Sequence, residues 1–165
     1  MSTAAPDPGG EGLSEYEVRL WRTWWQLRKR MDTVLEHDFQ LSAAISGSDF
    51  AVLVALSEAP GAALRARDLG RGLEWERSRV SHHLRRMERR GLITRRPTAE
   101  DGRGVVAALT PDGWRVLAKA AASHARLVRA MVFDPLDGED LAEVDRLFST
   151  VLASMGQFRP FGQRY

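Results

Sequence analysis

Residues 76–90 are the segment that most constrains how this chain folds. Val80, Leu84 and Met87 recur within it every three or four residues, which places them on one helix face and predicts that this face packs against a core. The opposite face and its flanks carry only hydrogen-bonding or basic side chains: Ser78, Ser81, His82, Arg85, Arg86 and Arg89. Six Arg stand against two Glu in this segment, and their mutual repulsion is relieved if phosphates are the counterions. The segment therefore predicts a helix that contacts double-stranded DNA with this face and with Arg77; the alternative is a solvated charged face.

A β-hairpin is predicted directly after this helix. Residues 92–94 begin one strand and residues 105–109 form a second, with a polar turn at 95–103 between them. An Arg near the tip of such a turn can enter a narrow minor groove, where the potential is most negative. We expect DNA contacts from Arg95, Arg96 and Arg103, and a turn shaped by Asp101 and Gly102. The alternative is an ordinary hairpin with solvated Arg side chains.

Helical periodicity and capping signals divide the rest of the chain. Helices are expected at about 14–37, 48–58, 66–72, 111–131 and 138–157, with loops at 41–47 and 73–75. The predicted fold class is mainly α: a winged helix-turn-helix with a small β-hairpin wing and terminal helices forming a dimerisation region. The expected organisation is a disordered tail at 1–12, a domain at 13–157 and a C-terminal tail at 158–165. Within the domain, 13–40 and 111–157 are expected to be dimerisation helices and 48–110 the winged-helix lobe.

The first expected helix carries a broad apolar face. Its stripe consists of Leu20, Trp24, Leu27, Met31 and Val34, widened by Trp21, Trp25 and Leu35. So wide a face exceeds what packing on one neighbouring helix needs, and it predicts burial against a second chain in a homodimer. The alternative use of these rings is an aromatic effector site, for which the candidate residues are Trp24, Leu27, Met31 and Phe50.

Composition bounds the function classes. Residues 65–103 hold 12 of the 24 Lys and Arg against 6 acidic residues, so positive charge is concentrated where the helix and hairpin are predicted. The chain has no cysteine, which excludes disulfides and thiolate chemistry. No signal-peptide pattern or bilayer-length apolar stretch is present, so we expect a cytoplasmic protein without a membrane partner. Catalytic and phosphate-binding motifs are absent, and neither an enzyme nor a cofactor is expected.

Two further interpretations are weighed against DNA binding. Glu36-His37-Asp38, with His124, is a candidate metal site, but neighbouring residues on a helix point in different directions. We therefore interpret them as helix-end or surface residues and expect no metal. A winged-helix module that binds proteins instead of DNA would carry an apolar or acidic face on residues 76–90, which this sequence does not.

Several ordered motifs resemble the MarR family of transcriptional regulators. They are the segments 50–56, 68–69 and 84–95, then Asp101-Gly102-Arg103 and 109–113, and the resemblance covers about residues 13–157. It implies a homodimer joined by its terminal helices that binds a pseudo-palindromic operator, usually as a repressor, with Asp101 and Arg103 in the wing. It also implies a small-molecule inducer, often an anionic phenolic. The lack of cysteine departs from the peroxide-sensing branch of that family and excludes direct thiol oxidation.

Overall fold

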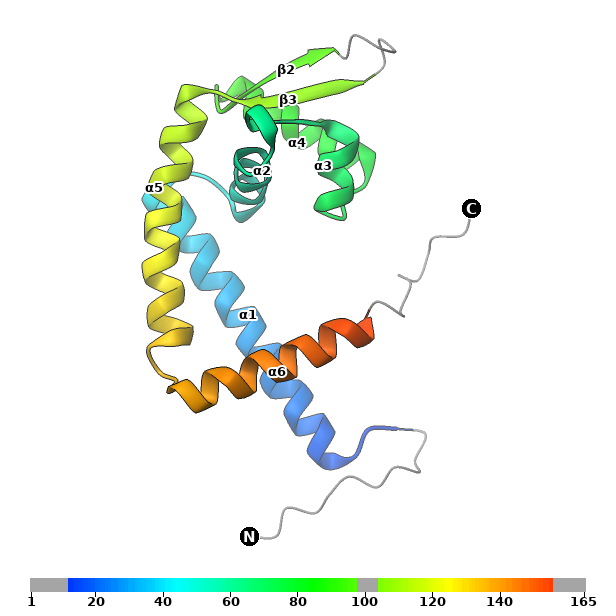
Figure 1. The fold of residues 1–165 in the computed structure, drawn as a ribbon, viewed down its shortest axis with the longest axis vertical. Coiled ribbons are helices and arrows are strands. Elements are labelled where there is room, and N and C mark those ends of the chain that lie inside the picture. Colours follow the sequence, from blue (N-terminus) through cyan, green and yellow to red (C-terminus); the bar gives the residue numbers. More distant parts are fainter. Residues whose placement is uncertain (1–11, 98–103, 156–165) are drawn as a thin grey trace. The chain divides into compact units, whose positions relative to one another are not determined.

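The computed structural model describes residues 12–97 and 104–155 (Figure 1). The elements are α1 (Glu15–Ala43), α2 (Gly47–Ser57), a 3₁₀ turn (Pro60–Ala62), β1 (Ala63–Arg65), α3 (Ala66–Gly72), α4 (Arg77–Arg89), β2 (Ile93–Pro97), β3 (Val105–Leu109), α5 (Pro111–Val128), a π-helical turn (Arg129–Phe133) and α6 (Gly138–Met155). Internal contacts divide the chain into two units that meet between His124 and Ala125.

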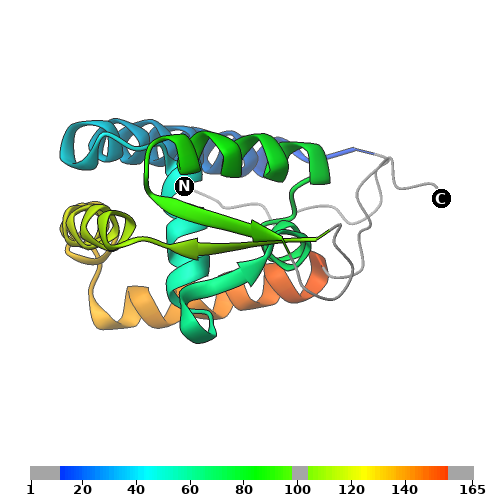
Figure 2. The same cartoon turned by 90° about the horizontal axis from the view of Figure 1, so that it is seen from above.

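The first unit is built around a three-stranded antiparallel sheet in the order β1-β3-β2 (Figure 2). Arg65, Val106 and Arg96 occupy neighbouring positions in one row across the three strands. Helix α4 packs against β2, α2 packs against β3, and α3 joins α2 and α4. The order of helices and strands is that of a winged helix-turn-helix, which confirms the predicted fold class.

An apolar core fixes α4 to this lobe. Side chains from every layer are at most 3% exposed: Val52, Leu53 and Leu56 of α2, Leu69 of α3, Val80, Leu84 and Met87 of α4, Ile93 of β2 and Ala107 of β3. Each large apolar side chain buried in this way contributes about 1.5–3 kcal/mol to folding. The burial of Val80, Leu84 and Met87 confirms the inward face predicted for residues 76–90.

Three boundaries differ from the sequence-based expectations. Residues 41–43 are the end of α1 and not a loop; α1 continues past the buried Phe39 and stops where Ala44 takes a left-handed conformation with φ of 53°. Strand β1 was not expected, because three residues are too few to give a recognisable alternation and the strand forms by pairing with β3. Strand β2 extends to Pro97, which places Arg95 and Arg96 in the strand and not in the turn.

The junction between the sheet and α5 is held by a helix cap at Thr110. The Thr110 hydroxyl accepts a hydrogen bond from the backbone N–H of Gly113 at 2.9 Å and lies 2.7 Å from the carbonyl oxygen of Gly91. Gly91 has a φ of 72°, the left-handed geometry in which many helices end and which costs glycine least. These bonds tie the start of α5 to the chain segment that links α4 to β2.

Gly113→Ala is expected to lower the free energy of unfolding by about 1–3 kcal/mol. A Cβ at this position would overlap the backbone carbonyl of Leu92, which cannot move without displacing the start of β2. Urea unfolding followed by circular dichroism measures the effect. Gly72→Ala is the matched control, because its Cβ would meet nothing within 4 Å; equal stability of the two variants would contradict the packing of α5 on this segment.

The second unit contains the end of α5, the π-helical turn and α6. Helix α6 begins at an Asp137 cap, whose Oδ1 accepts hydrogen bonds from the N–H groups of Glu139 and Asp140, each at 2.9 Å. Its apolar side chains remain exposed in the isolated chain: Leu147, Phe148, Val151, Leu152 and Met155. Among the described residues no single helix is long and apolar enough to span a membrane, and only α1 and α2 taken together, with a 74° bend, meet that test.

Candidate nucleic-acid interface

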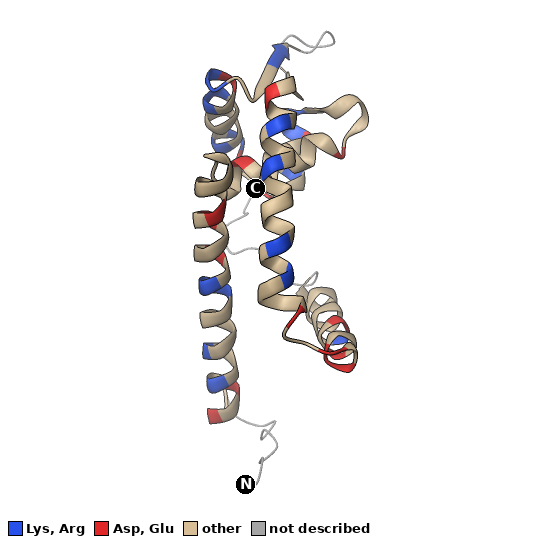
Figure 3. Ribbon diagram, turned by 90° about the vertical axis from the view of Figure 1, so that its left-hand side faces the viewer, with Lys and Arg blue, Asp and Glu red and all other residues tan. Residues whose placement is uncertain are grey.

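Helix α4 presents a basic face away from the core. The helix carries five Arg and one Glu (Figure 3). All of the following are exposed except Ser81, which is half-buried: Arg77, Ser78, Arg79, Ser81, His82, Arg85, Arg86 and Arg89. The outward positions predicted for residues 76–90 therefore lie on the surface, whereas His83 joins Val80, Leu84 and Met87 on the inward face. Whether these outward side chains contact DNA remains a prediction.

Two of the exposed guanidinium groups are held by neighbours. The Arg79 guanidinium lies 4.1 Å from the ring centroid of Trp75, in the residues that precede α4. Arg85 donates a hydrogen bond to the Ser81 hydroxyl at 3.0 Å, one helical turn away. Both contacts restrict a flexible side chain while leaving most of its N–H donors available to a ligand.

A buried polar cluster joins α4 to the start of α2. Asp49 and His83 are 2% and 7% exposed, and Asp49 Oδ1 lies 2.9 Å from His83 Nε2. Arg90 donates to Asp49 Oδ2 at 2.7 Å and to the carbonyl oxygen of Ala44 at 2.6 Å. Arg86 Nη2 lies 3.0 Å from His83 Nδ1. We call Asp49, His83, Arg86 and Arg90 the α2–α4 cluster.

Asp49 is ionised at the centre of this cluster. Burial alone would raise the pKa of its carboxyl, but hydrogen bonds from His83, from the Ser46 backbone N–H and from Arg90 outweigh that effect. The pKa of Asp49 therefore lies well below its usual range. The same carboxylate also forms a capping box with Ser46 at the start of α2.

The sequence analysis missed this cluster. The spacing of Ser46 and Asp49 is the signal of a capping box, which could have identified Asp49 as the start of α2. Its bond to Arg90 joins residues 41 positions apart, however, and no local pattern reveals such a pair.

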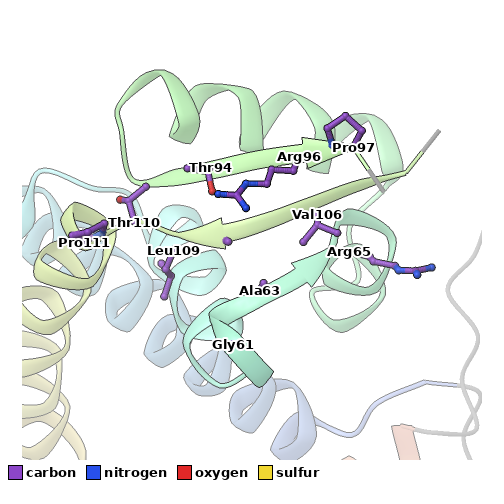
Figure 4. Close-up of a pocket in the computed structure, with 11 residues that line it drawn as sticks. Gly61, Ala63, Arg65, Thr94, Arg96, Pro97, Val106, Leu109, Thr110 and Pro111 are labelled. Atoms are coloured by element: carbon purple, nitrogen blue, oxygen red, sulfur yellow. The ribbon is translucent and has the colours of Figure 1, made fainter. Parts of the chain in front are cut away.

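The Arg residues predicted for the wing have different surroundings. Arg95 faces α4, where its guanidinium pairs with Glu88 at 2.7 Å and its side chain is 24% exposed. Arg96 lies on the opposite face of the sheet beside Thr94, over a hollow of about 660 Å³ (Figure 4). The wing-tip residues Arg103, Asp101 and Gly102 lie outside the described residues. Pairing with Glu88 reduces the charge that Arg95 offers to DNA.

The four effector-site candidates are not brought together within one chain. Phe50 stacks on Phe39 with ring centroids 4.5 Å apart and lies 5.2 Å from the His124 ring. Trp24 precedes Phe39 by 15 residues of α1, a rise of about 22 Å at 1.5 Å per residue. A site that uses Trp24, Leu27, Met31 and Phe50 together therefore requires a second chain, and the effector site remains a prediction.

The candidate metal residues have protein partners. Glu36 accepts a hydrogen bond from the Gly47 N–H at 2.7 Å, which joins α1 to the start of α2. Asp38 accepts one from the Ser123 hydroxyl at 2.8 Å. These contacts give both carboxylates a structural role between helices of the first unit.

The fold and the outward face of α4 define a class: a winged-helix DNA-binding protein. Its basic surface lies on α4, the second helix of the helix-turn-helix. Comparisons with known proteins place the chain within that class. The sequence model of the MarR family matches residues 45–104. AbsC, a MarR family transcriptional regulator from Streptomyces coelicolor, is 33% identical, with a TM-score of 0.81 over 90% of this chain and 100% of that one.

Two further relatives agree. Sco3205, a MarR family transcriptional regulator from Streptomyces coelicolor solved in complex with DNA, is 28% identical, with a TM-score of 0.82 over 94% of this chain and 97% of that one. The organic hydroperoxide resistance transcriptional regulator of Bacillus subtilis (strain 168) is 31% identical over 94 residues, which span 57% of this chain and 62% of that protein. The chain belongs to the MarR family of transcriptional regulators. Members of this family are DNA-binding regulators and not enzymes.

Proposed function

We propose that this protein is a sequence-specific transcriptional repressor that binds a pseudo-palindromic operator as a homodimer. The observation that carries the proposal is the face of α4, where exposed Arg side chains stand opposite a fully buried apolar face. A helix fixed in this way can enter a major groove as a rigid body, because its inward face is anchored by the core.

The proposed contacts divide into base-reading and phosphate-binding groups. Short side chains near the start of α4 and Arg side chains along it suit base edges and phosphates: Arg77, Ser78, Ser81, His82, Arg85, Arg86 and Arg89. Arg96 and Arg103 would bind the adjacent minor groove or its phosphates, with Asp101 and Gly102 shaping the turn. Arg95 remains among the proposed DNA contacts. We expect it to contribute less to DNA affinity than the other Arg residues, because its charge is already paired with Glu88.

A homodimer is supported by the apolar side chains that the isolated chain leaves exposed. Trp21 and Trp25 of α1 are 58% and 53% exposed, and Val151 and Met155 of α6 are 54% and 58% exposed. Exposed apolar side chains repeated along two helices are typical of a surface that a second chain covers. Two-fold symmetry then places the two α4 helices in half-sites about 10 base pairs apart, one turn of DNA.

We also propose that a small aromatic or anionic ligand releases the protein from its operator. Such a ligand would act by binding better to a dimer whose two α4 helices no longer fit successive grooves. The aromatic rings of Trp24 and Phe50 support a ligand with a planar apolar body.

Hydroxyl-radical footprinting on DNA from upstream of the protein's own gene tests the proposed mode of binding. We expect two protected patches related by two-fold symmetry and separated by about one helical turn. Arg89→Ala should weaken both patches, while Arg115→Ala, which removes the same charge from α5 where Arg115 pairs with Asp112, should leave them unchanged. Protection of a single patch, or equal effects of the two variants, would contradict the proposal.

A further inference from the structure

The two ring nitrogens of His83 have partners of opposite hydrogen-bonding character. Nε2 lies 2.9 Å from Asp49 Oδ1, and Nη2 of Arg86 lies 3.7 Å from the same oxygen. Nδ1 lies 3.0 Å from Nη2 of Arg86. The ring is buried and meets the Trp75 ring edge-on, with centroids 5.1 Å apart, so it has little freedom to turn.

These partners determine where the imidazole proton lies. An ionised carboxylate only accepts hydrogen bonds, so Nε2 of His83 must donate to Asp49. A guanidinium only donates, so Nδ1 must accept from Arg86. His83 is therefore the tautomer with its proton on Nε2. Because Asp49 fixes the orientation of the His83 ring, the ring in turn fixes the orientation of the Arg86 guanidinium.

Arg86 is anchored at one end and exposed at the other. One of its amino groups binds His83, whereas its side chain as a whole is 52% exposed. The remaining N–H donors thus face outward from α4 in an orientation set by the buried ring. A charged side chain that is ordered before binding loses less conformational entropy when it meets its ligand.

We propose that Asp49 and His83 are positioning residues that hold the Arg86 guanidinium ready for DNA. This inference rests on the proposed function, because it assigns to Arg86 a contact with the operator. Asp49 and His83 touch no DNA themselves; they act by fixing a side chain that does.

Two replacements of His83 separate its two bonds. The amide nitrogen of Gln lies near the position of Nε2, so His83→Gln keeps the donor toward Asp49 and loses the acceptor toward Arg86. The amide oxygen of Asn lies near the position of Nδ1, so His83→Asn keeps the acceptor toward Arg86 and loses the donor toward Asp49. If His83 only stabilised the fold, the variant with the lower free energy of unfolding would also have the lower affinity for DNA.

The test combines each His83 variant with Arg86→Ala and measures operator affinity by fluorescence anisotropy. Arg86→Ala should weaken specific binding about tenfold in the wild-type and His83→Asn backgrounds. It should cost less than about threefold in the His83→Gln background, where Arg86 has lost its acceptor on His83 and keeps only its longer contact with Asp49 at 3.7 Å. Arg85→Ala is the matched control, since within the described part of the chain the hydrogen bond of Arg85 goes to Ser81 on the helix surface, and its effect should be the same in every background. An Arg86→Ala effect that is equal in the wild-type and His83→Gln backgrounds would overturn the proposal.

A measurement without DNA distinguishes this inference from the proposed function. Long-range ¹H–¹⁵N spectra of the wild-type protein should show His83 protonated at Nε2 and unprotonated at Nδ1. The Arg86→Ala variant should lose the shift that the Nδ1 hydrogen bond produces. A tautomer with its proton on Nδ1 contradicts the positioning of Arg86, whereas the expected tautomer in a protein that does not prefer its own DNA contradicts only the proposed function.

Discussion

Asp49→Ala is expected to lower the free energy of unfolding by about 3–5 kcal/mol, the range for removing one partner of a buried ion pair. The change leaves buried His83 Nε2 without an acceptor and removes the carboxylate that pairs with Arg90 and caps α2. Urea unfolding at one fixed protein concentration measures it, since the stability of a dimer depends on concentration.

The control for this prediction is another ionised aspartate. Asp32 on α1 pairs with Arg28 at 3.9 Å, but both side chains are more than 60% exposed. Asp32→Ala should therefore change the free energy of unfolding by no more than about 0.5 kcal/mol. A loss below about 1 kcal/mol for Asp49→Ala would mean that the α2–α4 cluster adds little to the fold.

The contribution of Asp49 also depends on pH in a defined direction. Because the pKa of Asp49 is depressed in the folded protein, its stabilising effect is complete above the unfolded pKa of about 3.9 and is lost as pH falls below it. The difference in unfolding free energy between wild type and Asp49→Asn should be constant from about pH 6 to 7 and shrink below about pH 4. Urea titrations of both proteins across this range measure the difference.

Val151→Glu is expected to convert the proposed dimer to a monomer and to weaken operator binding by about 10²–10⁴-fold. The side chain lies on the apolar stripe of α6 and is 54% exposed in the isolated chain, so a second chain would have to bury the new charge without a partner. A monomer binds one half-site and loses the advantage of two linked contacts. Sedimentation velocity and anisotropy together measure the change.

Ser149→Glu is the matched control for this prediction. It adds the same charge to an exposed position two residues away, which a 3.6-residue repeat places on the other side of α6. This variant should remain dimeric and keep its affinity for the operator. A dimeric Val151→Glu protein, or a monomeric one that binds as tightly as wild type, would contradict the dimer proposal.

Features that depend on residues close together in the sequence could be predicted, and features that depend on distant residues could not. The faces of α4 and the start of α5 at Thr110 were predictable because helical periodicity and capping act within a few residues. Strand β1 was not, because its three residues form a strand only through their pairing with β3. Sequence periodicity placed His82 on the outward face of α4 but gave His83 no DNA contact, and only the packing of α4 shows that His83 is buried against Asp49.

The candidate site shows the same division. The outward Arg side chains of α4 were predicted from spacing alone, whereas the pairing of Arg95 with Glu88 depends on how β2 returns along α4. That Arg86 belongs partly to a buried cluster follows from contacts between elements that are distant in sequence. Contacts with residues distant in the sequence determine which Arg side chains are available to a ligand. Such contacts cannot be read from local patterns in a single sequence.

A fluorescence-anisotropy titration over a series of salt concentrations tests the central claim most directly. It compares DNA from upstream of the protein's own gene with a scrambled sequence of the same length and composition. The account predicts that the protein prefers its own DNA by about 10³-fold or more, with an affinity that falls steeply as salt rises because each phosphate contact releases counterions. Equal affinity for both sequences would contradict sequence-specific regulation, and no binding to either at low salt would contradict DNA binding by α4.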